Sequence, residues 1–285
     1  MPKKLLVILG PTAVGKSDFA VEKASEAGSV VVSCDSRQIF KELDIGVARP
    51  GAAQLAAVPH YFVASHSIFD NYTAGRYELE AMDLLEKLFQ EHDTVVMCGG
   101  SGLYIDALCN GLDDFPEADR ELRASLMQRL EAEGIESLRN DLRVLDPESY
   151  LSIDIANRQR IVRALEVTIA TGRPFSSFKS SPSKQRPFEI EKIGLTRPRE
   201  ELYERIDRRV DLMMSAGLEE EARGLLQYRS LPALNTVGYK ELFGYFDGEY
   251  DLEEAVRLIK RNTRHYAKRQ MTWWRRDTSI TWIQA

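Results

Sequence analysis

The sequence predicts an α/β fold in which helices cover both faces of a parallel sheet and an all-helical domain interrupts the chain. Short apolar runs alternate with amphipathic segments early in the chain and again near its end, as in parallel sheets. Between these regions, residues 115–171 carry helical patterns and no strand pattern. A length of 285 residues fits one large domain and a smaller one. We therefore expect a core of residues 1–114 and 188–285 around an insertion of residues 115–187 that contacts the substrate.

The strands of the core are predicted from short apolar runs, rich in valine, leucine and isoleucine, that end at turn residues. The expected strands are residues 5–9, 30–34, 94–98, 190–195 and 280–283. The core helices are predicted from apolar residues that recur at three- and four-residue spacing. The expected core helices are residues 17–27, 77–92, 199–215, 218–228 and 252–275.

The insertion is predicted from two amphipathic segments. Apolar residues recur every four positions at Leu122, Leu126 and Leu130, and again at Ile161, Leu165 and Ile169. A Gly-Arg-Pro sequence at 172–174 ends the second helix, and the polar, turn-rich residues 176–187 read as a loop that leads back to the sheet.

Composition excludes several classes of protein. No apolar run approaches the roughly 20 residues that span a bilayer, and the first run ends after five residues, too early for a signal peptide. We expect a cytoplasmic protein without a membrane partner, and a monomer, because no coiled-coil pattern is present. Cys34, Cys98 and Cys109 lack CxxC spacing, so free buried thiols are expected.

A phosphate-binding loop is predicted between the first strand and the first helix. The sequence GPTAVGKS fits G-x-x-x-x-G-K-[ST] without a gap, and its members are Gly10, Pro11, Thr12, Ala13, Val14, Gly15, Lys16 and Ser17. Glycines let backbone N–H groups point at an anion, to which the following helix adds its positive end. Lys16 supplies an ammonium group, and the Ser17 hydroxyl is the usual Mg²⁺ ligand. The loop indicates a P-loop NTPase-like core and a bound di- or triphosphate, but not which one; a plain strand-to-helix turn is the alternative.

Two polar residues follow other expected strands. Asp35 comes directly after residues 30–34, and Ser101 lies in the GGSG sequence after residues 94–98. Ligands of open α/β sheets bind at the carboxyl ends of the strands, so both side chains should share an edge with the phosphate loop. Asp35 is then a metal ligand or a general base, with a turn or N-cap aspartate as the alternative. For Ser101, the alternative is a tight turn.

Positive charge gathers in two expected helices. Arg205 and Arg209 lie four residues apart, where they could clamp a diphosphate or simply form salt bridges on a solvated helix, for instance to Glu201. Residues 257–276 contain eight Lys or Arg and no Asp or Glu, although the net charge of the chain is −6. Basic groups interleaved with aromatic ones favour a nucleic-acid partner over a solvated helix, and the Trp273–Trp274 pair is also compatible with core packing.

These motifs, taken together and in order, resemble the tRNA dimethylallyltransferases, also called tRNA isopentenyltransferases, over nearly the whole chain. The resemblance rests on GPTAVGKS at 10–17, DSRQIF at 35–40, DIGVARP at 44–50, GGSGLY at 99–104, NRQRIVRALEV at 157–167, TGRP at 171–174, TVGYKEL at 236–242 and YAKRQMTWWRR at 266–276. Three residues depart from the family pattern: Phe40 replaces an expected Tyr, Val47 a common Thr, and Ser101 a common Thr. The first two lose a hydroxyl group, whereas Ser101 keeps one.

The resemblance implies transfer of a dimethylallyl group from dimethylallyl diphosphate to N6 of adenosine 37, beside the anticodon, in tRNAs that read codons starting with U. The phosphate loop would then hold the diphosphate leaving group, together with Mg²⁺. Asp35 would act on the N6 amine, Arg209 would stabilise the diphosphate, and Ser101 would bond near the base or the phosphate. By the same resemblance, the tRNA would meet Asp35, Ser36, Arg37, Gln38, Ser101, Arg123, Gln159, Arg160, Arg163, Asn235, Gly238 and Lys240. Taken alone, Arg123 and Arg160 also fit ordinary surface arginines of amphipathic helices.

Three other functions share parts of this pattern. An ATP-dependent small-molecule kinase uses the same loop but has no use for a basic terminal helix. An isopentenyltransferase acting on free AMP, ADP or ATP needs neither that helix nor the insertion. A nucleotide-gated RNA-binding protein would bind tRNA without turnover and would tolerate Asp35→Asn.

Overall fold

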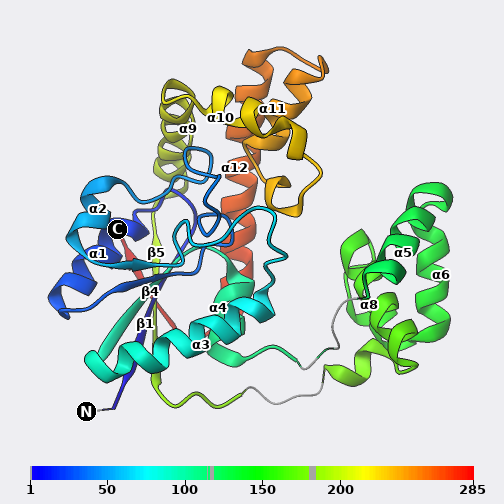
Figure 1. Ribbon diagram of the computed structural model, residues 1–285, viewed down its shortest axis with the longest axis horizontal. Helices are drawn as coiled ribbons and strands as arrows, with labels where there is room; N and C mark the ends of the chain where they lie inside the picture. The colour runs from blue at the N-terminus through cyan, green and yellow to red at the C-terminus, as the bar shows by residue number, and fades with distance from the viewer. Residues whose placement is uncertain (1, 114, 116–118, 180–183) are drawn as a thin grey trace. The chain divides into compact units, whose positions relative to one another are not determined.

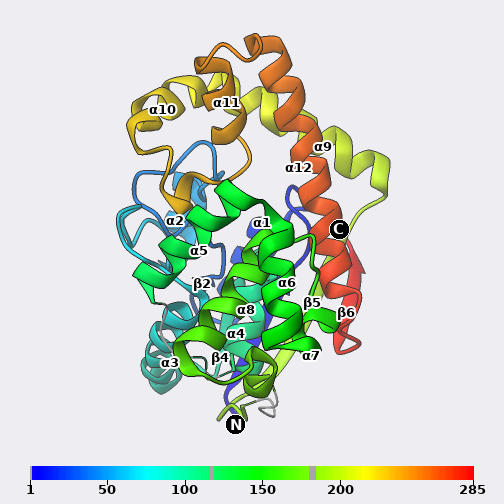
Figure 2. The ribbon, with the colours of Figure 1, turned by 90° about the vertical axis from the view of Figure 1, so that its right-hand side faces the viewer.

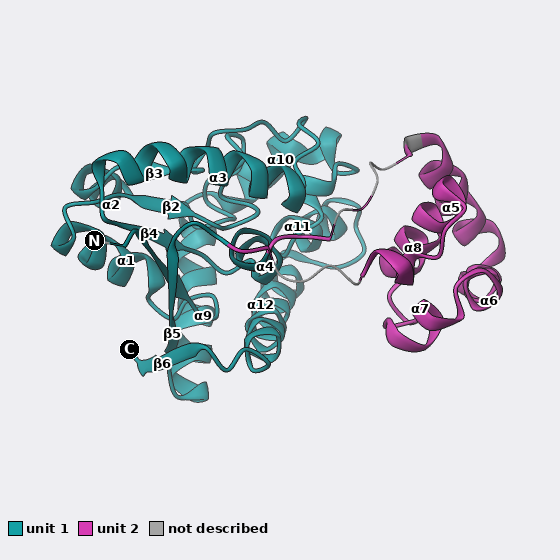
Figure 3. Ribbon diagram, turned by 90° about the horizontal axis from the view of Figure 1, so that it is seen from below, with its two compact units in different colours: residues 1–110, 186–285 teal, residues 111–185 magenta. Residues whose placement is uncertain are grey.

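The computed structural model describes residues 2–113, 115, 119–179 and 184–285, and divides the chain into two compact units. The larger unit comprises residues 1–110 and 186–285, and the smaller one residues 111–185, coloured separately in Figure 3. The sequence places the insertion at residues 115–187, so the two sets of boundaries differ by a few residues at each end.

The larger unit is built on a parallel six-stranded sheet with the order β3-β2-β4-β1-β5-β6 (Figure 1). The strands are β1 (Lys4–Leu9), β2 (Val31–Ser33), β3 (His60–Tyr61), β4 (Thr94–Cys98), β5 (Glu189–Thr196) and β6 (Ile280–Gln284). Central strand β1 places Leu5 opposite Val95 of β4 and Ile190 of β5. All five expected strands are present, and the polar ends of β1, β2 and β4 lie along one edge.

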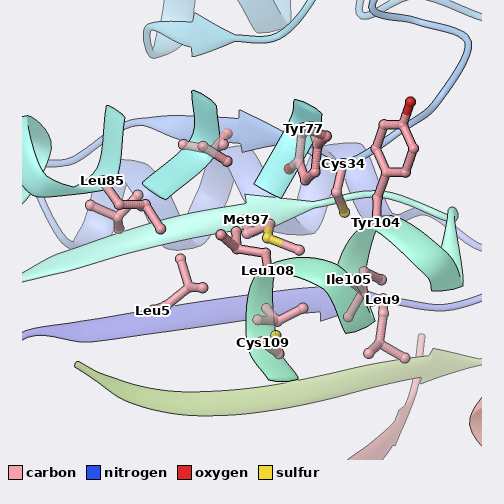
Figure 4. Close-up of a cluster of buried hydrophobic side chains, with 14 of the residues drawn as sticks. Leu5, Leu9, Cys34, Tyr77, Leu85, Met97, Tyr104, Ile105, Leu108 and Cys109 are labelled. Atoms are coloured by element: carbon pink, nitrogen blue, oxygen red, sulfur yellow. The ribbon is translucent and has the colours of Figure 1, made fainter. Parts of the chain in front are cut away.

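Helices cover both faces of this sheet. The helices of the larger unit are α1 (Lys16–Glu26), α2 (Ala52–Ala57), α3 (Ala74–Glu91), α4 (Gly102–Asn110), α9 (Arg199–Ser215), α10 (Leu218–Leu225), α11 (Tyr239–Phe246) and α12 (Leu252–Trp274). Alternate residues of β1 point to opposite sides: Leu5, Val7 and Leu9 pack with α3 and α4 (Figure 4), whereas Leu6 and Ile8 pack with α1 and α9. The predicted α/β architecture is confirmed.

A third apolar cluster lies beyond the strand ends. It joins Ile39, Phe40 and Leu43 to buried residues of α10, α11 and α12. Helices α9 and α12 pack against each other in this region (Figure 2). The cluster gives the loops after β2 a rigid support, which matters for the site described below.

The smaller unit is all-helical over the residues that the structure describes. Its helices are α5 (Arg120–Glu133), α6 (Ile135–Leu145), α7 (Pro147–Ser152) and α8 (Arg158–Thr171). Leu126, Leu130, Ile161 and Leu165 are buried together, as the four-residue spacing predicts. Ile169 is the exception at 43% exposed, because it lies in the last turn of α8.

Several details differ from the sequence-based expectations. The helix expected over 218–228 ends at Leu225 and continues as the 3-10 helix Leu226–Tyr228. Helices α2, α4, α6, α7 and α11 and the short strand β3 were not predicted individually. A 3-10 helix, Phe175–Phe178, covers the start of the loop expected over 176–187. Residues 180–183 of that loop lie outside the described residues. The three cysteines are free and buried, as predicted. Within the part of the chain that the structure describes, no helix is long and apolar enough to cross a membrane.

Candidate active site

The phosphate loop has the backbone that its glycines make possible. Gly10 and Gly15 have φ angles of 144° and 112°, which L-residues rarely adopt, and Ala13 is also left-handed at 65°. A Cβ atom on Gly10 would lie 2.7 Å from the carbonyl oxygen of Leu195 in β5, so the loop passes directly over the neighbouring strand. Gly15 is the N-cap of α1, which directs the positive end of that helix at the loop.

Lys16 folds back over the loop that precedes it. Its Nζ donates a hydrogen bond of 2.8 Å to the carbonyl oxygen of Pro11. Burial, assisted by the positive charge of Arg209, lowers the pKa of Lys16 from 10.5 to about 8, against the opposing effects of Cys98, Asp35 and Cys34. An anionic ligand would favour the charged ammonium form and would raise this pKa again.

Two arginines of α9 reach the same loop. The Nε atom of Arg205 donates to the carbonyl oxygen of Ala13 at 2.9 Å, and Nη1 of Arg209 donates to Oγ1 of Thr12 at 3.2 Å. Burial lowers the pKa of Arg209. Glu201, an expected salt-bridge partner of this pair, instead pairs with Arg197. The alternative of a solvated helix is therefore wrong for Arg209: its charge is directed inward.

Asp35 lies at the end of β2, where its carboxylate is partly engaged. Its Oδ1 atom accepts hydrogen bonds from the N–H groups of Arg37 and Gln38, at 2.9 and 3.3 Å. This is the turn geometry that the sequence left open, and it fixes the direction of the side chain. Asp35 nevertheless lines two cavities, so the turn presents the carboxylate to them.

Ser101 ties the loop after β4 to the loop after β2. Its Oγ atom accepts from the N–H of Ser36 at 2.9 Å and donates to Oγ of Ser36 at 3.1 Å. The structure therefore brings Ser101 and Ser36 together with Asp35, as the shared strand edge predicts.

Two cavities meet at these residues. One, of about 480 Å³, is lined by the phosphate loop, Gln38, Arg49 and three arginines of α9, Arg205, Arg208 and Arg209. The other, of about 440 Å³, is lined by Arg37, Asn235, Gly238 and Lys240, with apolar groups from α9 and α12. Both cavities are lined by Thr12, Asp35, Val47, Ala48, Arg209 and Tyr266. Most of the residues expected to bind the diphosphate line the first cavity, but Gly10, Pro11 and Val14 do not. Most of the core residues expected to contact the tRNA line the second cavity, whereas Gln38 lines only the first and Ser101 lines neither.

The site residues expected in the insertion form a group of their own within the smaller unit. Arg123 donates to Oε2 of Glu166 at 2.9 Å and to Oε1 of Gln159 at 2.7 Å, while Arg163 donates to Oε1 of Glu166 at 3.0 Å. Glu166 is only 1% exposed. Two arginines thus flank one buried carboxylate, which leaves net positive charge beside the exposed Arg160.

The basic character of α12 is weaker than its sequence suggests. Lys260 pairs with Asp211 and Arg264 with Asp207, both acids of α9, and Arg257 pairs with Glu254 in the first turn of α12 itself. The positive charge of residues 257–276 is therefore partly neutralised by acidic side chains from outside this run. Trp274 is buried at 2% exposed, which confirms the core interpretation for that residue, whereas Trp273 is 40% exposed.

Sequence reasoning missed Gln270 and Tyr266 as site residues. Gln270 of α12 is 6% exposed and bonds both the N–H of Thr12 and the carbonyl oxygen of Gly100. Tyr266 lines both cavities, and burial raises its pKa to about 12, so its hydroxyl stays protonated. Both residues belong to the YAKRQMTWWRR segment on which the family resemblance partly rests. The segment contains no recognisable catalytic motif, so the sequence alone did not mark these two residues as part of the site.

The oxygen donors of the first cavity fit a magnesium ion. Ser17 lies at the start of α1 beside Lys16, and the carboxylates of Asp18 and Asp35 line the same cavity. Mg²⁺ prefers oxygen ligands and is commonly held by one or two protein groups together with substrate phosphates. The donor set thus suits an ion that a diphosphate shares with the Ser17 hydroxyl.

Comparison with known proteins agrees with this geometry. A family model described as "IPP transferase" matches residues 38–277. The chain is 50% identical over 283 residues to tRNA dimethylallyltransferase 1 of Phocaeicola vulgatus, covering 99% of this chain and 94% of that protein. It is 53% identical over 279 residues to tRNA dimethylallyltransferase 2 of Porphyromonas gingivalis, covering 98% of this chain and 93% of that protein.

Similar solved structures also belong to the tRNA isopentenyl- and dimethylallyltransferases. The tRNA isopentenylpyrophosphate transferase of Bacillus halodurans is 33% identical with a TM-score of 0.71, over 99% of this chain and 90% of that one. A eukaryotic dimethylallyltransferase, described as acting on tRNA, is 26% identical with a TM-score of 0.83, over 99% of this chain and 74% of that one. The chain therefore belongs to the tRNA dimethylallyltransferase family.

Proposed function

We propose that this protein transfers a dimethylallyl group from dimethylallyl diphosphate to N6 of adenosine 37 in the anticodon loop of tRNAs that read codons starting with U. The product is N6-(dimethylallyl)adenosine. One observation carries the proposal: a cation-lined cavity at the phosphate loop and a second cavity share Asp35, Arg209 and Tyr266. Such an arrangement lets a diphosphate ester and an acceptor base enter separately and meet at a carboxylate.

The first cavity suits the diphosphate. Lys16, Arg205 and Arg209 converge on it with the N–H groups of the phosphate loop. When the C1–O bond of the isoprenoid breaks, its electron pair stays on the diphosphate, and these groups stabilise the growing negative charge. Magnesium, held by Ser17 and the diphosphate, would supply further charge neutralisation there.

The second cavity suits the adenine. A base stacked in an anticodon loop is inaccessible, so adenosine 37 must turn out of the stack to reach a pocket. Its N6 lone pair forms the new bond to C1, and the carboxylate of Asp35 accepts the proton that N6 loses. Because Oδ1 of Asp35 already accepts two backbone N–H groups, Oδ2 is the oxygen assigned to this proton.

The remaining candidates are assigned to RNA recognition. Ser36, Arg37, Asn235, Gly238 and Lys240 surround the second cavity or its rim, where the nucleotide and its neighbours would lie. Gln38 lines the first cavity and bonds the carbonyl oxygens of Val47 and Ala48, which suggests that it shapes the wall. We assign Arg123, Gln159, Arg160 and Arg163 of the insertion to the anticodon stem-loop, because three arginines stand against the single carboxylate of Glu166 in this group.

The test uses the purified protein with Mg²⁺, dimethylallyl diphosphate and an unmodified anticodon stem-loop that has adenosine at position 37. Mass spectrometry of the digested RNA should find one added C5H8 unit on that adenosine alone. Asp35→Asn should reduce the rate by about a hundredfold or more while RNA binding persists, because the amide oxygen can still accept the two backbone N–H groups. Asp83→Asn, which removes the same charge from an exposed position of α3, should behave like the unaltered protein.

Each rival function predicts a different outcome of this experiment. Modification of free AMP but not of RNA would identify a free-nucleotide isopentenyltransferase. ATP turnover with a small-molecule acceptor and no RNA product would identify a kinase. RNA binding without product, unaffected by Asp35→Asn, would identify a non-enzymatic RNA-binding protein.

A further inference from the structure

The segment of residues 44–49 forms a wall shared by the two cavities. Val47 and Ala48 line both of them. The carbonyl oxygens of the same two residues accept hydrogen bonds from Nε2 of Gln38, at 3.2 and 2.9 Å. Gln38 in turn donates its backbone N–H to Asp35. The position of this segment therefore sets the shape of both cavities. Through Gln38, it also influences the position of the turn that carries Asp35.

One carboxylate of a distant helix holds this segment. Glu221 of α10 accepts three consecutive backbone N–H groups, from Asp44 at 3.2 Å, Ile45 at 2.8 Å and Gly46 at 3.0 Å. Consecutive N–H groups of this kind form a concave anion-binding site, and here the anion is a side chain of the protein itself. Hydrogen bonds to a charged acceptor are stronger than those between neutral groups.

The carboxylate is itself fixed by a buried tyrosine. The hydroxyl of Tyr239 donates to Oε1 of Glu221 at 2.6 Å, and the Tyr239 side chain is fully buried. Its ring also touches the segment: a Cβ atom on Gly46 would lie 2.6–2.8 Å from ring and hydroxyl atoms of Tyr239. Glycine is therefore required at position 46 by close approach and not by backbone angle.

We infer that Glu221 is a positioning residue for the transfer reaction, because it sets the wall that separates the isoprenoid diphosphate from the acceptor base. The inference rests on the proposed function for the identity of the two ligands. Glu221 lines neither cavity, so its effect passes through Val47, Ala48 and Gln38. It is distinct from Asp35, Lys16 and Arg209, which would touch the reacting groups.

The experiment compares Glu221→Ala, Glu221→Gln and Gly46→Ala with the control Glu220→Gln, which removes a negative charge from an exposed site on the same helix. Glu221→Ala should raise KM for both substrates by roughly tenfold with a smaller change in kcat, because other bonds hold Asp35 and Lys16. Glu221→Gln keeps one acceptor oxygen and should give an intermediate result. Gly46→Ala removes no charge but displaces the segment from Tyr239, so it should reproduce the same rise in both KM values.

The kinetics and two further measurements separate positioning from general stability. A purely structural role would reduce the folded fraction, which lowers kcat and leaves KM unchanged. Hydrogen exchange should show faster exchange at the amides of residues 44–46 in Glu221→Ala and not in Glu220→Gln. Titration with inorganic diphosphate should show weaker binding in the variants, a readout that survives even if the unaltered protein fails to modify RNA. Unchanged KM values and unchanged exchange in both Glu221→Ala and Gly46→Ala would overturn the inference.

Discussion

The side chain of Gln270 accepts a hydrogen bond of 2.9 Å from the backbone N–H of Thr12, 258 positions earlier in the chain. Through its Nε2 atom the same amide donates to the carbonyl oxygen of Gly100 at 2.8 Å. One buried side chain of α12 thus joins the phosphate loop after β1 to the loop after β4. The terminal helix is therefore part of the phosphate site as well as a basic surface element.

This bridge predicts the effect of Gln270→Leu. The apolar side chain would leave the buried carbonyl oxygen of Gly100 without a partner, at a cost of about 1–3 kcal/mol, and would also remove the acceptor of the partly buried Thr12 N–H. We expect the free energy of unfolding to fall by about 2 kcal/mol, and we expect weaker binding of inorganic diphosphate. Chemical denaturation and calorimetric titration measure the two effects. Gln90→Leu, at the exposed end of α3, is the control, and equal results for both variants would contradict the prediction.

Lys16 predicts a pH dependence of diphosphate binding. Burial lowers the pKa of Lys16 to about 8 in the ligand-free protein, and a bound diphosphate raises it. Binding above pH 8 must therefore take up a proton, so the Kd for inorganic diphosphate should rise by about tenfold per pH unit there. Calorimetric titration in two buffers with different ionisation enthalpies measures the proton uptake. Lys16→Met should abolish that uptake; its persistence would assign the proton to another group.

The same pKa has a consequence for the stability of the ligand-free protein. The pKa of Lys16 in the folded state is lower than the 10.5 of an ordinary lysine side chain, so between about pH 8 and 10.5 the unfolded chain binds more protons at this residue. The contribution of Lys16 to the free energy of unfolding therefore rises with pH across that window. Thermal unfolding of the unaltered protein and of Lys16→Met should show this difference, and parallel pH profiles would contradict it.

The local features of the fold and site could be predicted from the sequence. The strands are recognisable in the sequence as short apolar runs. The phosphate loop is a contiguous motif, and the spacing of its glycines determines its backbone conformation. The edge shared by Asp35 and Ser101 follows from the geometry of parallel sheets. Each of these features is caused by residues that are close together in the sequence, so the pattern of a single segment is sufficient to predict it.

Contacts between distant segments could not be predicted in this way. Glu78 of α3 is buried because it pairs with Arg186 at 2.7 Å, whereas its apolar neighbour Leu79 is 70% exposed. Gln270 and Glu221 act on loops that lie far away in sequence, and neither belongs to a local motif. Only the folded chain shows which acids of α9 neutralise Lys260 and Arg264.

Arg209 and Arg205 predict separable effects on transfer. Arg209 lines both cavities and contacts Thr12, whereas Arg205 lines only the first. Arg209→Gln should lower kcat by about 10²–10³, the usual loss on removing a group that stabilises transition-state charge. Arg205→Gln should mainly raise KM for dimethylallyl diphosphate.

Steady-state kinetics with each substrate varied in turn tests this difference. Arg199→Gln, which removes a charge from the exposed first turn of the same helix, is the control. A kcat loss of the same size for Arg205→Gln and Arg209→Gln would show that the two arginines act together as a simple diphosphate clamp.

The insertion predicts how RNA binding depends on salt. Arg160 is exposed on α8, beside the Arg123–Glu166–Arg163 cluster whose carboxylate is buried. If Arg160 contacts a phosphate, Arg160→Ala should weaken binding of the anticodon stem-loop and reduce the slope of log K against log salt by about one. Arg143→Ala, on exposed α6 of the same unit, removes the same charge and should leave the slope unchanged. Equal changes in both variants would contradict a phosphate contact at Arg160, because a specific contact depends on the position of the charge and a diffuse electrostatic attraction does not.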